Sequence, residues 1–522
     1  MTMRTHLSSA ARRLSAASAA SAVSLLALLA CRPPVATTEP VPVEPPPPLI
    51  DTTSSAPGVW PDEPFRAQAP APGAIAELKI PAVASFKLDN GLEVHLVRQD
   101  KLPTVTMTFA FDFGAVSDPK NQTGLTSICM DLLDEGTKKY ETAAFEEKQA
   151  DHAVNVSSFG GSESAGINVR ALRSQLGPAL DLMAEMLQEP GMRQTDLDRL
   201  KDRRKASLLQ AKASPGSIGG RLYSMLVWGA GHPYGRIETE ASINAVGLKD
   251  CQKVIGKLKP GGAHLWVTGM IDEAELRQEL GARLPKWSGK APARPKIAAA
   301  KPRLGTVFFV HVKDAAQSSI YVGHPGPRRQ DPDYEATDLM LEILGGSFSS
   351  RINMNLREDK GYTYGGRAGV SYRRAGGSFT ANSSVRTDVT GPALREVIKE
   401  ILGMRAGDPT AEELRRVQEG AMLALPAEFA TPSDTLGAVQ RLSFFDLPFD
   451  WYAGYQQRLK AVDTKAVRTA AEKHLRAQDF VVLVVGDASK VLKDLDAIAA
   501  EKVFGGGGLV VLDADGKPAP RP

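Results

Sequence analysis

The sequence predicts an α+β fold made of two homologous α/β-sandwich repeats. Strand-like and helix-like segments follow one another without the strict alternation that marks a parallel βαβ sheet. A Gly-Pro-Ala-Leu motif at 177–180 recurs at 391–394, and the same offset of 214 residues superposes the strand-like segments 105–114 and 319–328. A stretch rich in Pro, Lys and Ala at 286–303 separates the two copies. Agreement of several elements at one offset indicates an internal duplication.

Each repeat is predicted to open with β-structure and to continue with helices. In the first repeat, an Asp-Asn-Gly turn lies between strand-like flanks at 86–96, which is typical of a β-hairpin. The apolar spacing then predicts helices at 143–151, 175–187 and 196–212, and strands at 154–158 and 166–172.

Composition limits the classes of partner. The 522 residues carry 63 Lys and Arg against 60 Asp and Glu, so we expect no nucleic-acid partner. The length allows two or more domains. We predict a signal peptide at 1–30, a Pro-rich linker at 31–77, an N-terminal domain at 78–285, an interdomain linker at 286–303, a C-terminal domain at 304–495 and a flexible tail at 496–522.

The N-terminus carries the pattern of an export signal. Arg4, Arg12 and Arg13 precede an apolar, Ala-rich stretch at 16–30 that is short for a membrane span. The stretch ends in Leu-Leu-Ala before Cys31, which resembles a bacterial lipobox, so Cys31 is the predicted lipidation site. The alternative is an ordinary signal peptide with an incidental cysteine. We expect a lipid-anchored protein of the bacterial cell envelope, at the outer membrane facing the periplasm.

Residues 124–137 read GLTSICMDLLDEGT and carry the most specific signal in the chain. They resemble the metal-binding helix of the family that comprises pitrilysin, insulin-degrading enzyme and mitochondrial processing peptidase. That family has the inverted zinc motif His-x-x-Glu-His there. The resemblance covers about residues 80–490 and also rests on LDNGL at 88–92, HPYG at 232–235, GGSFSSR at 345–351 and LREDKGYTY at 356–364. The HPYG element, with its His232, resembles a structural loop of the family rather than a metal ligand.

The zinc ligands of the family are missing here. Ser127 and Asp131 stand at the two His positions and Met130 at the Glu position, and helical spacing places the three on one face, away from Cys129. Ser and Met are poor zinc ligands and a lone Asp cannot hold the ion. The family's third ligand is a Glu from a downstream helix, but no Glu occurs between Glu189 and Glu238. We therefore expect no cofactor and no metal in this chain.

Two cysteines remain after Cys31. Cys129 and Cys251 can pair in an oxidising envelope, but two cysteines do not make a disulfide framework. We expect Cys129, on a helix near the core, to be a small buried hydrophobe.

One motif of the family is intact. The resemblance implies that Arg357 and Tyr364, seven residues apart, match an Arg–Tyr pair that binds substrate and polarises its carbonyl near zinc. Both side chains are hydrogen-bond donors, and a donor aimed at a developing oxyanion lowers the barrier to attack. The alternative is that Arg357 caps a helix and Tyr364 packs on a strand. The glycine pairs at 345–346 and 365–366 are turn residues, or allow a peptide backbone to approach closely.

Three functions remain open. The resemblance favours a zinc-less subunit of a heterodimeric metallopeptidase. It would be inactive alone, bind peptide or unfolded polypeptide in a clam-like half-chamber, and supply Arg357 and Tyr364 to a homologous zinc-bearing partner. The second is a non-catalytic peptide-binding or scaffold protein of the same fold, comparable to the core subunits of respiratory complexes. The third is a stand-alone hydrolase with another site, for which the sequence offers no triad or metal cluster.

Overall fold

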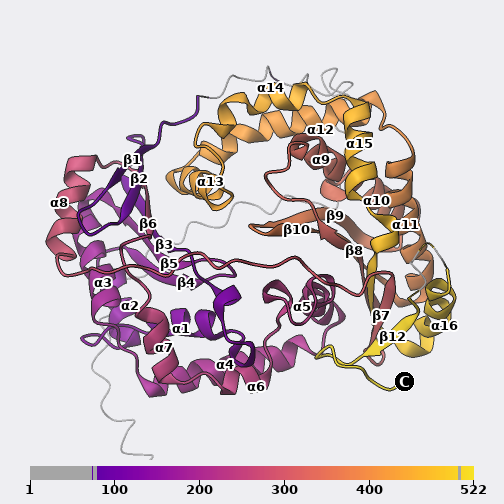
Figure 1. The fold of residues 1–522 in the computed structure, drawn as a ribbon, viewed down its shortest axis with the longest axis horizontal. Coiled ribbons are helices and arrows are strands. Elements are labelled where there is room, and N and C mark those ends of the chain that lie inside the picture. Colours follow the sequence, from indigo (N-terminus) through magenta and orange to yellow (C-terminus); the bar gives the residue numbers. More distant parts are fainter. Residues whose placement is uncertain (1–72, 74–78, 502, 504–506) are drawn as a thin grey trace, which may run out of the picture. The chain divides into compact units, whose positions relative to one another are not determined.

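The computed structural model describes residue 73, residues 79–501, residue 503 and residues 507–522. The predicted signal peptide at 1–30, Cys31 and nearly all of the linker at 31–77 lie outside these residues. In the part that is described, no helix is long and apolar enough to cross a membrane. Helices pack on two six-stranded sheets, which confirms the mixed α+β class (Figure 1).

The first sheet contains the strands that the sequence placed in the first repeat. Its order is β1 (Ala84–Lys87), β2 (Glu93–Arg98), β6 (His264–Gly269), β3 (Thr104–Phe111), β5 (Ala165–Leu172) and β4 (Asn155–Gly160). β1 and β2 form the predicted antiparallel hairpin. Its turn places Gly91 at a φ of 90°, in a region that glycine enters at no steric cost.

The second sheet repeats the first. Its order is β12 (Leu509–Leu512), β7 (Thr306–His311), β11 (Val481–Gly486), β8 (Gln317–Gly326), β10 (Gly376–Arg386) and β9 (Thr363–Arg373). In both sheets the second and third strands pair in parallel, and the following pairs are antiparallel. Only the first edge differs, because β1 is antiparallel to its neighbour and β12 is parallel. The topology confirms the duplication.

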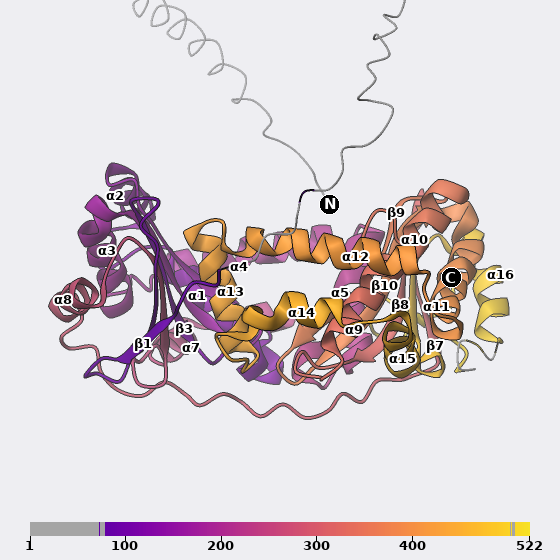
Figure 2. The same ribbon diagram turned by 90° about the horizontal axis from the view of Figure 1, so that it is seen from above.

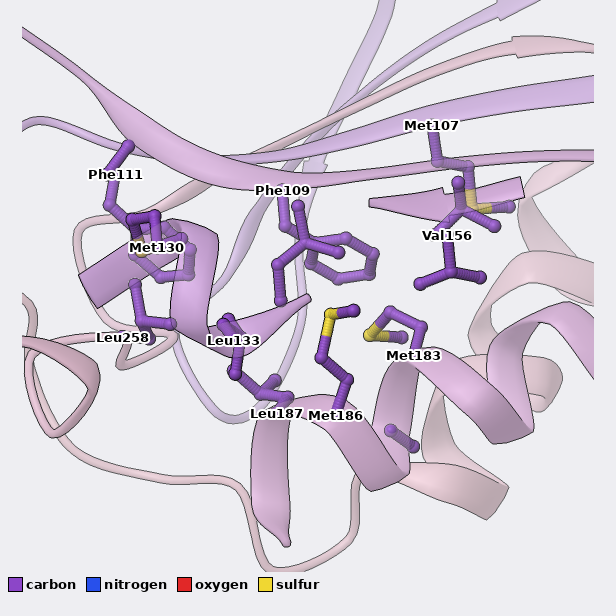
Figure 3. Close-up of a cluster of buried hydrophobic side chains, with 14 of the residues drawn as sticks. Met107, Phe109, Phe111, Met130, Leu133, Val156, Met183, Met186, Leu187 and Leu258 are labelled. Carbon is purple, nitrogen blue, oxygen red and sulfur yellow. The ribbon is translucent and has the colours of Figure 1, made fainter. Parts of the chain in front are cut away.

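Amphipathic helices cover one face of each sheet. α1 (Leu125–Leu133) and α3 (Leu176–Gln188) pack their apolar sides under the first sheet, as Figure 3 shows for Met183 and Met186 beneath Phe109. In the second repeat α9 (Tyr334–Leu341) and α11 (Thr390–Ala406) take the same role. The predicted helices at 143–151 and 196–212 are α2 (Thr142–Asp151) and α4 (Gln194–Ala211). Apart from α5 and α13, the other described α-helices are α6 (Glu240–Asn244), α7 (Leu248–Ile255), α8 (Glu273–Arg283), α10 (Arg351–Asn353), α12 (Ala411–Ala424), α14 (Tyr455–Lys460), α15 (Thr464–His474) and α16 (Ala488–Ala499).

The two repeats exchange helices across the molecule. α5 (Pro215–Trp228) precedes the interdomain linker, yet its apolar side packs on β8 and β11 of the second sheet. α13 (Pro432–Phe444) follows that linker, yet it packs on β3 and β6 of the first sheet, beside the indigo strands in Figure 1. Residues 291–303 contain no helix or strand and run between the repeats (Figure 2). Each sheet is therefore covered in part by a helix from the other side of the predicted interdomain linker.

The C-terminal end differs from the flexible tail predicted at 496–522. α16 extends to Ala499, and Leu509–Leu512 forms strand β12 beside β7. In the turn beyond it, Asp515 pairs with Arg221 of α5 at 3.0 Å and with Lys212, at the end of α4, at 2.8 Å. The Gly and Pro content suggested a loose chain, but strand pairing and two ion pairs hold this segment in place.

Cys129 and Cys251 form a disulfide that joins α1 to α7. Both residues are fully buried. The prediction that Cys129 is an unpaired small hydrophobe was therefore wrong, although its burial was right. The sequence could not settle the pairing because 122 residues separate the two cysteines and only the packing of α7 against α1 brings them together.

Candidate functional site

The two positions of α1 that correspond to the family's histidines lie on the side of the helix that faces α4. Ser127 and Asp131 are half-buried on the side that faces α4, whereas Met130 is fully buried. Figure 3 shows Met130 beside Phe111 of the first sheet and near Leu258. Of the three motif positions, Met130 is buried in the core, so only Ser127 and Asp131 reach the side that faces α4.

An arginine of α4 occupies the space between the two ligand positions. Arg204 donates from Nη2 to Ser127 Oγ at 2.6 Å and to Asp131 Oδ2 at 2.7 Å, and from Nη1 to Glu238 Oε1 at 2.7 Å. Burial alone would lower the pKa of Arg204, but Glu238 and Asp131 raise it above its ordinary value. A fixed positive charge bonded to both ligand positions repels a second cation at the same place.

A cavity of about 630 Å³ lies beside this cluster. Its walls carry four arginines and two carboxylates: Arg203, Arg204, Arg221, Arg236, Asp131 and Glu238. Sequence reasoning missed Arg204 and Glu238. A signal was present, because a family that needs a Glu on this helix has here Lys-Asp-Arg-Arg-Lys at 201–205. The partner of Arg204 could not be found that way, since Glu238 reaches the site from a loop after α5.

The intact Arg–Tyr pair lies on the second repeat. Arg357 belongs to the π-helical segment η7 (Met354–Asp359) and Tyr364 to the start of the edge strand β9. Arg357 Nη1 donates to the backbone oxygen of Tyr364 at 3.0 Å, and its guanidinium lies 4.8 Å from the ring centre of Phe348. The Tyr364 side chain is 87% exposed and that of Phe348 is 60% exposed. The sequence motif therefore becomes an exposed aromatic and cationic patch, formed by Phe348, Arg357 and Tyr364.

The Tyr364 hydroxyl and the Phe348 ring are exposed, and the contacts of the Arg357 guanidinium lie at the surface. Arg357 also pairs with Glu358 at 3.1 Å, which is an exposed contact of little energetic weight. Among the described residues, neither Arg357 nor Tyr364 bonds to α1, so the structure does not join the intact pair to the degenerate helix within one chain. π-helical turns such as η7 recur at functional sites.

One glycine of each pair near this patch serves packing. Gly345 lies in the π-helical segment η6 (Glu342–Gly346), where an added Cβ would come within 2.2 Å of Ala368. Gly366 lies within β9, against Ile352 and Leu356. Both positions let the helical segments approach β9 closely, so they are not turn residues as one reading of the sequence had them.

His232 has the structural role that its motif indicated. It precedes the short turn η5 (Pro233–Gly235), accepts from the backbone of Tyr234 and bonds the carbonyl of Ala298 at 2.8 Å. Its ring stacks on Trp228 of α5. Both ring nitrogens are therefore used in holding the loop.

Comparisons with known proteins identify the family of the chain. Residues 94–218 match the family described as insulinase (peptidase family M16), and residues 258–421 match the one described as peptidase M16 inactive domain. The chain belongs to the M16 family of insulinase-like peptidases, as a member whose zinc motif is degenerate. It is 23% identical over 402 residues to a protein of Helicobacter pylori named non-peptidase homolog YmxG, which covers 74% of this chain and 90% of that protein. It is 24% identical to an uncharacterised zinc protease of Mycobacterium leprae, over 62% of this chain and 74% of that protein.

Solved structures share the fold. A peptidase M16 inactive domain from Pseudomonas fluorescens matches with a TM-score of 0.70 and 24% identity, over 78% of this chain and 98% of its own. A protease from Helicobacter pylori matches with a TM-score of 0.71 and 15% identity, over 78% and 100%. A chain of complex III from Candida albicans matches with a TM-score of 0.64 and 14% identity, over 78% and 97%.

Proposed function

We propose that this chain is the zinc-less subunit of a heterodimeric envelope metallopeptidase. It binds peptide or unfolded polypeptide in a half-chamber and presents Arg357 and Tyr364 to the zinc site of a homologous partner. The chain itself is inactive and holds no zinc at α1. The catalytic zinc of the complex belongs to the partner subunit.

The observation that carries the proposal is the contrast between the two sites. The metal position on α1 is filled by the guanidinium of Arg204, which bonds Ser127 and Asp131. The Arg–Tyr site instead keeps two large aromatic side chains and a cation exposed. Tyr and Arg are among the residue types that contribute most to binding at interfaces, so this exposed group suits contact with a bound peptide.

The chemistry assigned to the pair is that of oxyanion stabilisation. As water attacks a scissile carbonyl, negative charge develops on its oxygen, and the Tyr364 hydroxyl and the Arg357 guanidinium can both donate to it. Arg357 also holds the start of β9 through the backbone of Tyr364, so it orients the tyrosine.

The test is peptide hydrolysis by the complex of this chain with its zinc-bearing partner. We expect Arg357→Ala and Tyr364→Phe each to lower kcat about a hundred-fold or more, which is the cost of losing one oxyanion donor. The double variant should lose less than the sum of the two, since both act on one charge. Complex formation, measured by gel filtration, should be unchanged because no core volume is removed.

Arg367→Ala is the matched control. Arg367 is exposed on the same strand, three residues beyond Tyr364, and the β9–β10 pairing shifts register between the two positions. It should leave hydrolysis unchanged. Full activity in both Arg357→Ala and Tyr364→Phe would contradict the catalytic role and leave the chain as a peptide-binding or scaffold subunit.

The envelope location rests on a separate argument. The Cys129–Cys251 disulfide fits an oxidising compartment such as the periplasm. We propose lipid anchoring at Cys31, because the preceding Leu-Leu-Ala resembles a lipobox. A lipid chain attached there would contribute roughly 0.8 kcal/mol of membrane binding per buried methylene. Cys31→Ser expressed without the partner should move from the membrane to the soluble fraction. Membrane fractionation of that variant equal to the parent protein would rule out the anchor.

A further inference from the structure

A second group of metal-binding side chains lies on the α13 side of the first sheet. β2 and β6 are parallel neighbours whose register places Glu93 opposite His264 and His95 opposite Trp266. Alternation along each strand puts Glu93, His95, His264 and Trp266 on one face. The register of two strands that are 165 residues apart in sequence therefore assembles this group, and each side chain stands on a rigid hydrogen-bonded scaffold.

The ligand atoms converge at distances that suit one ion. His95 Nε2 lies 3.2 Å from His264 Nδ1, and His264 Nδ1 lies 3.6 Å from Glu93 Oε2. The three atoms lie within 4.8 Å of one another. Ligands held about 2.0–2.2 Å from a tetrahedral zinc are separated by roughly 3.3–3.6 Å. The separation between His264 and Glu93 falls in this range, and the one between His95 and His264 is only slightly shorter. Glu93 is half-buried, and rotation about its three side-chain torsions can bring the carboxylate closer to His95.

An outer contact fixes the imidazole of His95. Ser85 of β1 lies opposite His95, and its Oγ is 2.9 Å from His95 Nδ1. If Nδ1–H donates to Ser85, Nε2 is left with a free lone pair directed at His264. Metal-binding histidines use the second ring nitrogen in this way, and such partners set the tautomer and the ring orientation.

Other contacts of the group leave room for an ion. The His95 ring stacks on Trp266 at 4.1 Å, and Phe449 packs at its edge. Lys87 lies 3.7 Å from Glu93 Oε1, the carboxylate oxygen that does not face His264. His264 also lines a cavity of about 320 Å³ together with Asp112, Arg374 and Arg441. A fourth coordination position is therefore open to water or a small ligand from that cavity.

We propose that Glu93, His95 and His264 bind a divalent transition-metal ion, with zinc as the best fit to two imidazoles and one carboxylate. This site is separate from the degenerate position on α1 and independent of the proposed function. In the alternative, the same atoms form a hydrogen-bonded chain in which Ser85 donates to His95 and His95 donates to His264. The two arrangements differ in whether the group takes up metal.

The test is titration of the full chain with Zn²⁺ after dialysis against a chelator, followed by calorimetry. We expect one equivalent to bind. His264→Gln and Glu93→Gln should each weaken binding by more than about 100-fold, since even an outer partner is worth about 10- to 100-fold. Ser85→Ala should fall within that smaller range. No uptake by the parent chain, or equal affinity in His264→Gln, would overturn the proposal.

Two controls locate the ion. His152→Gln removes a half-buried histidine outside the group, which contacts Gln175, and should leave binding unchanged. Asp131→Asn should also leave it unchanged, whereas loss of binding in that variant would place the metal at α1 and overturn the proposal.

A second measurement leaves all three proposed metal-binding residues intact. Co²⁺ bound at His95 should quench the fluorescence of the stacked Trp266, and the quenched component should be missing in Trp266→Phe. Equal quenching with and without Trp266 would place the ion elsewhere.

Discussion

Arg204 shows how a single residue replaces the role of an ion. Its guanidinium bonds Ser127, Asp131 and Glu238, so one cation from α4 neutralises a carboxylate of α1 and a carboxylate of the loop after α5. Arginine suits the place because its planar fork offers five donors and stays charged at every physiological pH. The metal site is therefore converted into a structural ion-pair network rather than emptied.

Removing this cation should destabilise the fold. We expect Arg204→Met to lower the free energy of unfolding by about 2 kcal/mol, because hydrogen bonds to charged groups contribute roughly 1.5–3 kcal/mol. Urea denaturation measures the change. Arg203→Met is the matched control, since Arg203 is well exposed and lies 3.7 Å from Glu135. It should change stability by less than about 0.5 kcal/mol. Equal stability of Arg204→Met and the parent would mean that the network contributes nothing.

At the scale of elements, the C-terminal end of α1 is tied to the edge strand β4 through Asp134. The backbone N–H of Ser158 donates to Asp134 Oδ1 at 2.6 Å. Burial, aided by the charges of Asp131 and Glu135, raises the pKa of Asp134 from 3.8 to about 7. A carboxyl group with a raised pKa favours the protonated form in the folded state, so it contributes stability below pH 4 that is lost as the pH rises through 7.

Asp134→Asn should remove this pH dependence. The amide oxygen can still accept from Ser158, but the side chain can no longer ionise. The free energy of unfolding of the variant, minus that of the parent, should rise between pH 4 and pH 7 and stay level above pH 7. The rise is at most about 4 kcal/mol, which corresponds to the whole difference in pKa. Thermal unfolding of both proteins across this range is the measurement. A constant difference between them would show that Asp134 ionises normally in the folded state.

At the scale of the whole molecule, the exchange of α5 and α13 makes each repeat depend on the other. The apolar side of α5 packs with Phe308, Val481 and Leu483 of the second sheet. The first sheet in turn buries Trp266 against Leu436 and Val439 of α13. Polar contacts reinforce the junction, since Glu163 accepts from the Tyr234 hydroxyl and the backbone of Arg374.

The first repeat alone should therefore fail to fold cooperatively. A fragment of residues 79–285 keeps α5 but loses the sheet that covers it, which exposes a large apolar surface. We expect aggregation or a broad thermal transition, whereas the full chain unfolds in a single transition. Co-expression with a fragment of residues 304–522 should restore a soluble pair. A monomeric fragment 79–285 with a sharp transition would show that the exchange of helices is not needed for stability.

The sequence by itself determined the duplicated α+β architecture, the loss of the zinc motif and the Arg357–Tyr364 motif. These features are local or periodic, so side-chain spacing along one chain segment is enough to reveal them. The β1–β2 hairpin, α3 and α4 were predicted to within a few residues for the same reason.

Only the tertiary structure decided which residues meet across long sequence separations. The bonds of Arg204, the Cys129–Cys251 disulfide, the group at His95 and His264 and the exchange of α5 and α13 all join segments that no local pattern links. Met130 shows the same limit at one position, because helical spacing gave its angle on α1 but not which surface lay opposite. The hydrophobic effect is non-directional and rewards burial anywhere, so the choice of partner is set by how the whole chain packs.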